Sequence, residues 1–305
     1  MKTPVLVVFF NRPSLVMKVL DQLSEVKPVK IYLSCDGPRS SVDGEANLVS
    51  ELRRTVLAVI DWECEIYTKF SELNLGCKYN VSTSVAWFFQ NENEGIVLED
   101  DCVPSLEFFP FATEFLEYYK NDKRVGTISG RNEVFEQTKA TAPYYFSRKF
   151  FCWGWASWSD RILDNDVEVG LQRKVSKAVL QGLPFKEWLL VRGMIGLIQS
   201  KQVNSWAYPF DLSFREKGQL CLIPGKNLVQ NIGFDTVGTH SRGGVKDKLS
   251  IADSFYVNPS SEVDVVSNIE FMDAFIKKRH PNILKLLALS MARYLGPIRR
   301  RLVRR

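Results

Sequence analysis

The chain has 305 residues, of which 45% are apolar, 12% aromatic and 25% charged. This composition is typical of a globular protein and excludes collagen-like, low-complexity and disordered chains. The formal net charge is +5, but residues 277–305 hold ten Lys and Arg and no acid, whereas residues 1–276 carry 30 basic and 35 acidic side chains. A mildly acidic body is therefore followed by a basic C-terminal segment.

The sequence has no feature of a secreted or membrane-spanning protein. The apolar run 5–10 is too short for a signal sequence, and Asn11 and Arg12 follow it in place of a small-residue cleavage site. No stretch of 18 apolar residues occurs. The six cysteines are scattered without a C-x-x-C pair, which argues against a zinc site or a disulfide framework. We therefore expect a reduced, cytoplasmic setting.

The first 130 residues alternate short apolar runs with amphipathic stretches. The apolar runs are β-branched or aromatic, which predicts buried strands at 5–10, 29–35, 64–70, 95–98 and 125–129. Helical spacing predicts helices at 14–23, 45–60, 78–89 and 107–119, with Ser14 and Ser105 as helix caps. This alternation predicts an α/β fold, with a mostly parallel, Rossmann-like sheet flanked by helices.

Beyond residue 130 the pattern changes. Residues 131–175 are rich in aromatic side chains and lack a regular period, so we expect a looped region that covers one edge of the sheet. A helix at 185–200, a strand at 220–223 and a Gly- and Asn-punctuated loop at 224–244 are predicted to follow.

Three successive acids, Glu99, Asp100 and Asp101, follow a predicted buried strand. Ligands of open α/β sheets bind beyond the carboxyl ends of the strands, and three neighbouring carboxylates there need a counter-charge. Their oxygens suit Mg²⁺ or Mn²⁺, which would neutralise a diphosphate leaving group. The alternative is a solvated loop in which Asp101 caps the next helix, and the three residues alone leave the two interpretations even. Because Ser105 is better placed than Asp101 to cap the next helix, the metal interpretation is favoured.

Two other strand ends and a Trp-rich segment carry further candidates. Arg12, after the first strand, can pair with phosphate or with a surface acid, and the two roles have equal weight. Asp36, after the second strand, lies in an Asp-Gly-Pro sequence. A structural role in a turn outweighs the alternative that Asp36 binds a nucleotide base. Residues 151–158 hold three of the seven Trp residues around Gly154. Core packing is their usual role, and stacking on a sugar with close backbone approach at Gly154 is the alternative.

Seven short motifs occur in a fixed order within residues 4–245. They are Phe10-Asn11-Arg12-Pro13, Cys35-Asp36-Gly37-Pro38-Arg39, Asn74-Leu75-Gly76-Cys77, Leu98-Glu99-Asp100-Asp101-Cys102, Ile128-Ser129-Gly130-Arg131-Asn132, Trp153-Gly154-Trp155-Ala156-Ser157-Trp158 and Asn231-Ile232-Gly233-Phe234-Asp235 with Thr239-His240. In this order they resemble a bacterial GT-A-fold glycosyltransferase. The group is the family 2-like nucleotide-diphospho-sugar transferases, distantly similar to N-acetylglucosaminyltransferase I.

The resemblance implies roles for the acid triplet. The triplet occupies the DXD position of the family, where the last acid, Asp101, is expected to hold Mn²⁺ or Mg²⁺. Asp100 and Glu99 would then contact the ribose and the donor sugar.

The resemblance also implies roles away from the triplet. Asp36 matches the acid that recognises the nucleotide base, with uridine expected by analogy, and Arg12 matches a cation near the nucleotide. Gly154 and Trp155 match a segment that faces the donor sugar and the acceptor. His240 matches the end of a segment that closes over the diphosphate.

The general base is less well defined by the sequence. An inverting transferase needs a carboxylate that takes the proton of the acceptor hydroxyl. Where the relatives often have an Asp, this chain has Asn204 and Ala207. Asp211 is the nearest carboxylate and Asp160 is the reserve, although either can be a helix-cap or surface acid.

The C-terminal segment combines an apolar helical stripe at 284–295 with an arginine cluster at 299–305. The stripe can pack on the catalytic domain, but the arginines indicate an anionic partner. An amphipathic helix with a polybasic end is typical of a peripheral membrane anchor. The acidic body and the lack of a reader motif argue against nucleic acid. We expect a peripheral location on the inner face of the cell membrane.

The sequence thus predicts a catalytic domain over 1–275, with a nucleotide-sugar half at about 1–130 and an acceptor half at about 131–275, and a basic tail over 276–305. We expect an inverting, metal-dependent transferase that moves a sugar from a nucleotide donor to a bacterial surface glycan, such as lipopolysaccharide, O-antigen or capsule. That acceptor can be lipid-linked. Two alternatives are a sugar-nucleotide-binding protein without turnover and a metal phosphohydrolase that uses the same carboxylates.

Overall fold

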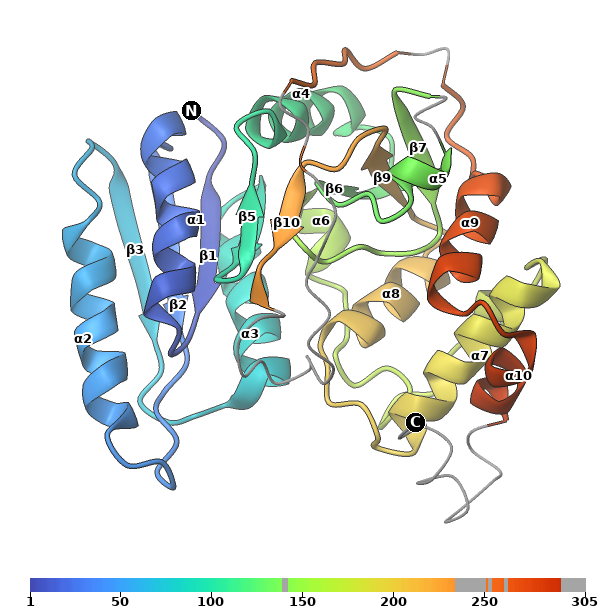
Figure 1. The fold of residues 1–305 in the computed structure, drawn as a ribbon, viewed down its shortest axis with the longest axis horizontal. Helices are drawn as coiled ribbons and strands as arrows, with labels where there is room; N and C mark the ends of the chain where they lie inside the picture. The colour runs from blue at the N-terminus through green and yellow to red at the C-terminus, as the bar shows by residue number, and fades with distance from the viewer. Residues whose placement is uncertain (139–141, 234–250, 252–253, 261–262, 292–305) are drawn as a thin grey trace.

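The computed structural model describes residues 1–138, 142–233, 251, 254–260 and 263–291. A central sheet divides these residues into helical layers on its two faces (Figure 1). This arrangement confirms the predicted α/β class with a mostly parallel sheet flanked by helices.

Within the described residues the sheet has eight strands in the order β3-β2-β1-β4-β8-β6-β9-β7. All run in one direction except β7 and β8, which are antiparallel to their neighbours. A second, two-stranded sheet pairs β10 with β5 in antiparallel register. The strands are β1 Val5–Phe9, β2 Lys30–Cys35, β3 Glu65–Phe70, β4 Glu94–Glu99, β5 Cys102–Pro104, β6 Val125–Ser129, β7 Tyr144–Ser147, β8 Trp155–Trp158, β9 Leu220–Pro224 and β10 Val229–Asn231.

Alternate side chains of the strands enter two different cores, because successive residues of a strand point to opposite faces. Val5 and Val7 of β1 pack toward α1, α2 and α4, whereas Leu6 and Val8 pack toward α3 and α8. The helices are α1 Pro13–Val26, α2 Glu45–Ala58, α3 Gly76–Asn91, α4 Phe108–Tyr119, α5 Phe135–Thr138, α6 Ser159–Ile162, α7 Phe185–Gln199, α8 Ala207–Glu216, α9 Ile269–Arg279 and α10 Ile283–Ser290, with a 3-10 turn at Lys177–Leu180.

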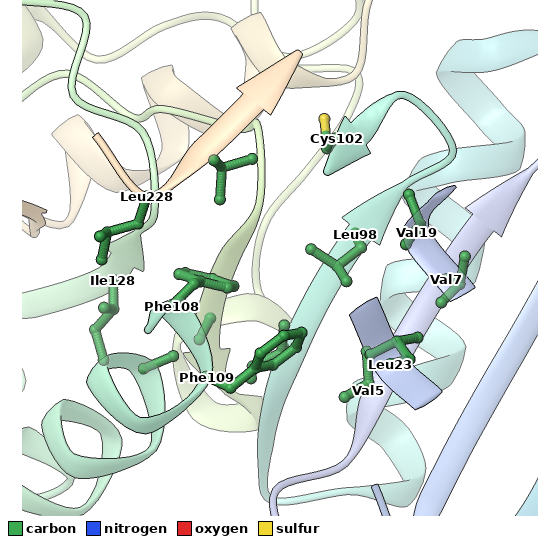
Figure 2. Packing of buried hydrophobic residues seen from close by; sticks show 14 of the residues in the cluster. Val5, Val7, Val19, Leu23, Leu98, Cys102, Phe108, Phe109, Ile128 and Leu228 are labelled. Atoms are coloured by element: carbon green, nitrogen blue, oxygen red, sulfur yellow. The ribbon is translucent and has the colours of Figure 1, made fainter. Parts of the chain in front are cut away.

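The larger core lies between the sheet and α1, α2 and α4. Figure 2 shows part of it, with Val5 and Leu98 of the sheet beside Leu23 of α1 and Phe109 of α4. These side chains are completely or almost completely buried. Burial of this apolar surface is the main force that fixes the strand ends on which the candidate site is built.

The predicted helix caps are wrong in both places. At α1, Pro13 takes the first helical position and Arg12 the cap position, so Ser14 lies inside the first turn. At α4, the backbone oxygen of Ser105 accepts a bond from Phe108 N–H at 3.1 Å, but the Ser105 hydroxyl has no partner in the described part of the chain. Neither helix start has a side-chain cap.

The prediction that residues 131–175 form a looped cover at one edge of the sheet is also wrong. Trp155–Trp158 is strand β8, which is inserted in the middle of the sheet between β4 and β6. All four of its residues are buried, so the strand lacks the alternation of polar and apolar residues that identifies a half-exposed strand. Over the described residues, none of the helices is long and apolar enough to cross a bilayer.

Candidate functional site

The carboxyl ends of β1, β2 and β4 meet at one edge of the sheet, since these strands are parallel neighbours. Arg12 lies beyond β1, and residues 99–101 end β4 and turn into β5. The backbone N–H of Asp100 donates to Val8 O at 3.0 Å, which fixes this acid turn against the end of β1. The fold thereby brings together the predicted site residues Arg12, Asp100 and Asp101.

The Arg12 guanidinium bridges two of the three acids. Its Nε lies 3.2 Å from Asp100 Oδ2 and its Nη1 2.9 Å from Asp101 Oδ2, while Nη2 contacts Asp100 Oδ1. The Asp100 side chain is 4% exposed and that of Asp101 is 18% exposed. Arg12 therefore supplies part of the counter-charge that three adjacent carboxylates require.

The first two acids of the turn hold protons more strongly than free carboxylates do. Burial raises the pKa of Glu99 to about 8, with further contributions from the charges of Asp101 and Asp100. Burial likewise raises the pKa of Asp100 to about 6, although Arg12 opposes the shift. A hydrogen bond from Trp206 also acts to lower the pKa of Glu99. The acid turn thus contains more negative charge than one guanidinium neutralises.

A hard divalent cation at the acid turn would have to be held through a single carboxylate. Among the described residues, no group of three His, Cys, Asp or Glu side chains converges on one point. Mg²⁺ and Mn²⁺ do not need such a group, because water and substrate phosphates commonly complete their coordination. Asp101 is the most suitable ligand, since it is the more exposed of the two acids that contact Arg12.

Strand β10 ends directly over the acid turn. Ile232 N–H donates to the backbone oxygen of Asp101 at 2.8 Å, and Asn231 Nδ2 lies 3.3 Å from Asp101 Oδ1. A Cβ at Gly233 would lie 2.2 Å from Asp101 Oδ2. Asp101 therefore anchors the chain where it enters residues 234–250, and the predicted site residue His240 lies outside the described residues.

Asp36 is 3% exposed and lies between the end of β2 and the start of α3. Its carboxylate accepts backbone N–H bonds from Gly37 at 2.9 Å, Leu75 at 2.8 Å and Gly76 at 2.9 Å. Asn74 Nδ2 donates a fourth bond at 3.2 Å. A carboxylate offers about four acceptor positions, so the acceptor capacity of Asp36 is taken up by the loop that leads into α3.

The Trp-rich segment divides between the site and the core. Gly154 O accepts a bond from Gly130 N at 2.8 Å, at the carboxyl end of β6, and the ring of Trp153 lies 5.0 Å from the Arg131 guanidinium. The side chain of Trp155 is completely buried and contacts Trp206 with 6.1 Å between ring centroids. Gly154 thus lies at the edge that carries the acid turn, whereas the Trp155 ring belongs to the core.

The two predicted general bases are both paired with cations. Asp211 is completely buried and accepts bonds from Lys149 Nζ, Phe150 N and Arg215 Nε at 2.7–3.0 Å. Burial acts to raise the pKa of Asp211, but Lys149 and Arg215 more than offset it, so this pKa is lowered.

Asp160 lies at the opposite end of the sheet. Strand β8 is antiparallel to β4 and pairs Trp158 with Glu94, six residues before Asp100, which corresponds to a separation of about 20 Å. Asp160 contacts Lys123 and forms an ion pair with Arg161. The structure therefore does not bring it to the acid turn.

Glu45, the first residue of α2, was missed by sequence reasoning. Its carboxylate accepts bonds from Asn11 Nδ2 at 2.7 Å and from Arg39 N at 2.7 Å. It therefore joins the loop after β1 to the loop after β2, on the edge that carries Arg12. An acid in the first turn of a predicted helix, directly after a strand-end loop, is the signal that could have found it.

No protein-family model and no curated protein matches this chain. Solved structures similar to it include HddC from Yersinia pseudotuberculosis, at 10% identity over 53% of this chain and 79% of that chain, with a TM-score of 0.34. The inositol-1-phosphate CTP transferase from T. maritima is 9% identical over 73% and 85% of the two chains, with a TM-score of 0.36. An apo-UDP-glucose pyrophosphorylase is 7% identical over 76% and 93%, with a TM-score of 0.38. The names of the last two describe enzymes of nucleotides or nucleotide sugars, and these likenesses are too distant to carry a functional argument.

Proposed function

We propose that the chain binds a nucleoside-diphosphate sugar at the carboxyl ends of β1 and β4 and transfers the sugar to a glycan of the bacterial surface. The observation that carries the proposal is the contact of Arg12 with Asp100 and Asp101 across two strand ends. A diphosphate needs cations around it. This edge offers the guanidinium of Arg12, and the oxygens of the acid turn could hold a divalent cation.

Each group of the acid turn has a chemical task in this proposal. Asp101 would hold Mn²⁺ or Mg²⁺, which neutralises the charge of the diphosphate leaving group when bound. Arg12 would exchange a carboxylate partner for a phosphate oxygen, since its planar fork binds either anion. Glu99, whose pKa burial raises to about 8, would contact the ribose or the donor sugar.

The test is nucleotide binding by the Asp101→Ala variant. Calorimetry with UDP and Mn²⁺ should give a dissociation constant at least tenfold above that of the wild type, because the carboxylate that holds the ion is gone. The matched control is Asp61→Ala, which removes an exposed acid far along the chain from the acid turn. Equal Mn²⁺-dependent affinities for UDP in the wild type and in Asp101→Ala would contradict the metal role.

A second candidate function is sugar-nucleotide binding without turnover. The pairing of Asp211 and Asp160 with cations favours it, because neither carboxylate is available to take a proton from an acceptor hydroxyl. Release of UDP that depends on an added glycan excludes this candidate. Donor hydrolysis that needs no glycan would instead indicate a metal phosphohydrolase.

A membrane surface is the partner that we propose for the C-terminal segment. Helix α10 exposes Ile283 and Leu284, at 45% and 69%, and the arginine cluster 299–305 follows it in the sequence. Apolar side chains next to a polybasic segment favour a surface of anionic lipids. Such a location on the inner face of the membrane would place the site near a lipid-linked acceptor.

A further inference from the structure

Asn80, in the second turn of α3, has a buried polar atom that the fold does not satisfy. The residue is 3% exposed, and within the described part of the chain its Oδ1 has no hydrogen-bond partner. A buried amide oxygen without a donor is unfavourable, and the large majority of such atoms in folded proteins are paired. The Asn80 oxygen therefore needs a hydrogen-bond donor that the described residues do not supply, and a bound ligand could supply it.

The place of Asn80 follows from its neighbour one turn later. Ser84 Oγ lies 2.5 Å from Ser34 Oγ in β2. Residues four apart share one face of a helix, so Asn80 also faces the sheet, one turn closer to the start of α3. Helical side chains lean toward the N-terminus of their helix. The Asn80 amide is thus directed toward the carboxyl end of β2, where Asp36 contacts Leu75 and Gly76.

Asp36 and Asn80, at this edge of the sheet, differ in the hydrogen bonds that they can still accept. Asp36 already receives four hydrogen bonds, from the backbone of Gly37, Leu75 and Gly76 and from the side chain of Asn74. A donor from a ligand would have to displace one of them. Asn80 has an open acceptor and, as an amide, a donor on the same group.

We propose that Asn80, rather than Asp36, pairs with the edge of the nucleotide base. The matching chemistry is an N–H next to a carbonyl, as in the imide edge of uracil. The Asn80 oxygen would accept from the ring N–H and its amide would donate to the adjacent carbonyl. This inference rests on the proposed function, because it assigns the base end of the nucleotide whose diphosphate lies at the acid turn.

The test compares two ligands on the Asn80→Leu variant. Leucine has the same number and branching of side-chain heavy atoms as asparagine and removes the unsatisfied oxygen, so the melting temperature should stay equal or rise. UDP affinity with Mn²⁺ should fall about tenfold or more, whereas inorganic pyrophosphate with Mn²⁺, which has no base, should bind as in the wild type. Asn91→Leu is the matched control, because Asn91 is exposed in the last turn of the same helix.

Two results would overturn the assignment. One is unchanged UDP affinity in Asn80→Leu. The other is a lower melting temperature with equal losses of UDP and pyrophosphate binding, which would make Asn80 a structural residue. Failure of the proposed function is distinguishable from both, since the wild type itself would then bind neither UDP nor pyrophosphate.

Discussion

At the scale of single residues, the candidate site depends on side chains that connect strand ends far apart in the sequence. Arg12 links the end of β1 to the acid turn, and Glu45 links the loops after β1 and β2 through Asn11 and Arg39. Each link is charge-assisted, and hydrogen bonds of this kind are about twice as strong as neutral ones. The geometry of the rim therefore depends on ionised carboxylates.

Glu45 makes this dependence measurable as a function of pH. The hydrogen bonds from the Arg39 side chain are the main cause that lowers the pKa of Glu45 to about 2. The unfolded chain has a value of about 4.3, so the stabilisation is present at neutral pH and is lost as pH falls from about 4.5 toward 2. Glu45→Gln should lower the free energy of unfolding in urea at pH 7 and flatten its decline toward pH 3.

The control for this experiment lies on the same helix. Glu51 pairs with Arg54 on the exposed face of α2, with side chains 64% and 74% exposed. Exposed pairs contribute little, so Glu51→Gln should keep the pH profile of the wild type. Parallel profiles for Glu45→Gln and the wild type would show that Glu45 has no special role.

The candidate site was predictable where it follows from strand order and unpredictable where it depends on loop contacts. Parallel strands bring their carboxyl ends to one edge, which is enough to place Arg12 near the acid turn. It was not predictable that hydrogen bonds within the protein would occupy all acceptor positions of the Asp36 carboxylate. Three of the four donors come from Asn74, Leu75 and Gly76, nearly forty residues away. Local sequence contains no information about such contacts.

At the scale of elements, the contact of Gly154, just before β8, with β10 shapes the site edge. Gly154 has φ of +65°, and a Cβ there would lie 2.7 Å from Val229 Cγ2 of β10. The left-handed backbone disfavours alanine by about 1–2 kcal/mol. The clash with a packed valine adds about 1–3 kcal/mol.

Gly154→Ala should therefore reduce the free energy of unfolding by about 2–5 kcal/mol, which is the sum of the two costs. The control is Gly182→Ala, where φ is also +65° but nothing lies within 4 Å of the added methyl group. The difference between the two variants in urea unfolding isolates the contact with Val229. Adding Val229→Ala to Gly154→Ala should recover part of the loss, and equal effects of the two glycine variants would contradict this account.

The elements themselves were predictable in proportion to their regularity. The strands β1, β2, β3, β4, β6 and β9 and the helices α1 to α4 and α7 follow from apolar runs and helical periods, within a few residues at their ends. The prediction that the strand at 64–70 is buried is wrong, because β3 lies at the edge of the sheet and four of its six residues are exposed. The missed strands, β5, β7, β8 and β10, have three or four residues each. Such short strands owe their conformation to the neighbours that they pair with, so the sequence around them has no period to detect.

At the scale of the whole molecule, a buried ionic network attaches the second half of the chain to the sheet. Arg215 of α8 contacts Glu187 of α7 at 2.8 Å and Asp211 at 2.9 Å, and Asp211 in turn binds Phe150 N after β7. Removal of one partner from such a network leaves a buried charge without compensation. Asp211 is thus suited to hold the segment that leads to Gly154, which is a positioning role.

The C-terminal helices lie at one end of the molecule, with α10 packed on α7 (Figure 1). Leu286 of α10 is buried, whereas Leu284 is 69% exposed and Met291 is 50% exposed. A helix that buries one face against the protein and exposes leucine on another is suited to contact a lipid surface. The basic side chains of the C-terminal segment would add attraction to anionic headgroups.

We therefore expect the full chain to cosediment with vesicles that contain phosphatidylserine and not with vesicles of phosphatidylcholine alone, and to dissociate as salt screens the attraction. Each basic residue near the surface contributes about 1 kcal/mol, so replacing Arg299, Arg300 and Arg301 with Gln should weaken binding about a hundredfold. Replacing the exposed Lys174, Lys177 and Lys201 with Gln removes the same charge from the body of the protein. If both triple variants lose the same affinity, net charge and not the C-terminal segment governs the association, and the membrane role of the tail is wrong.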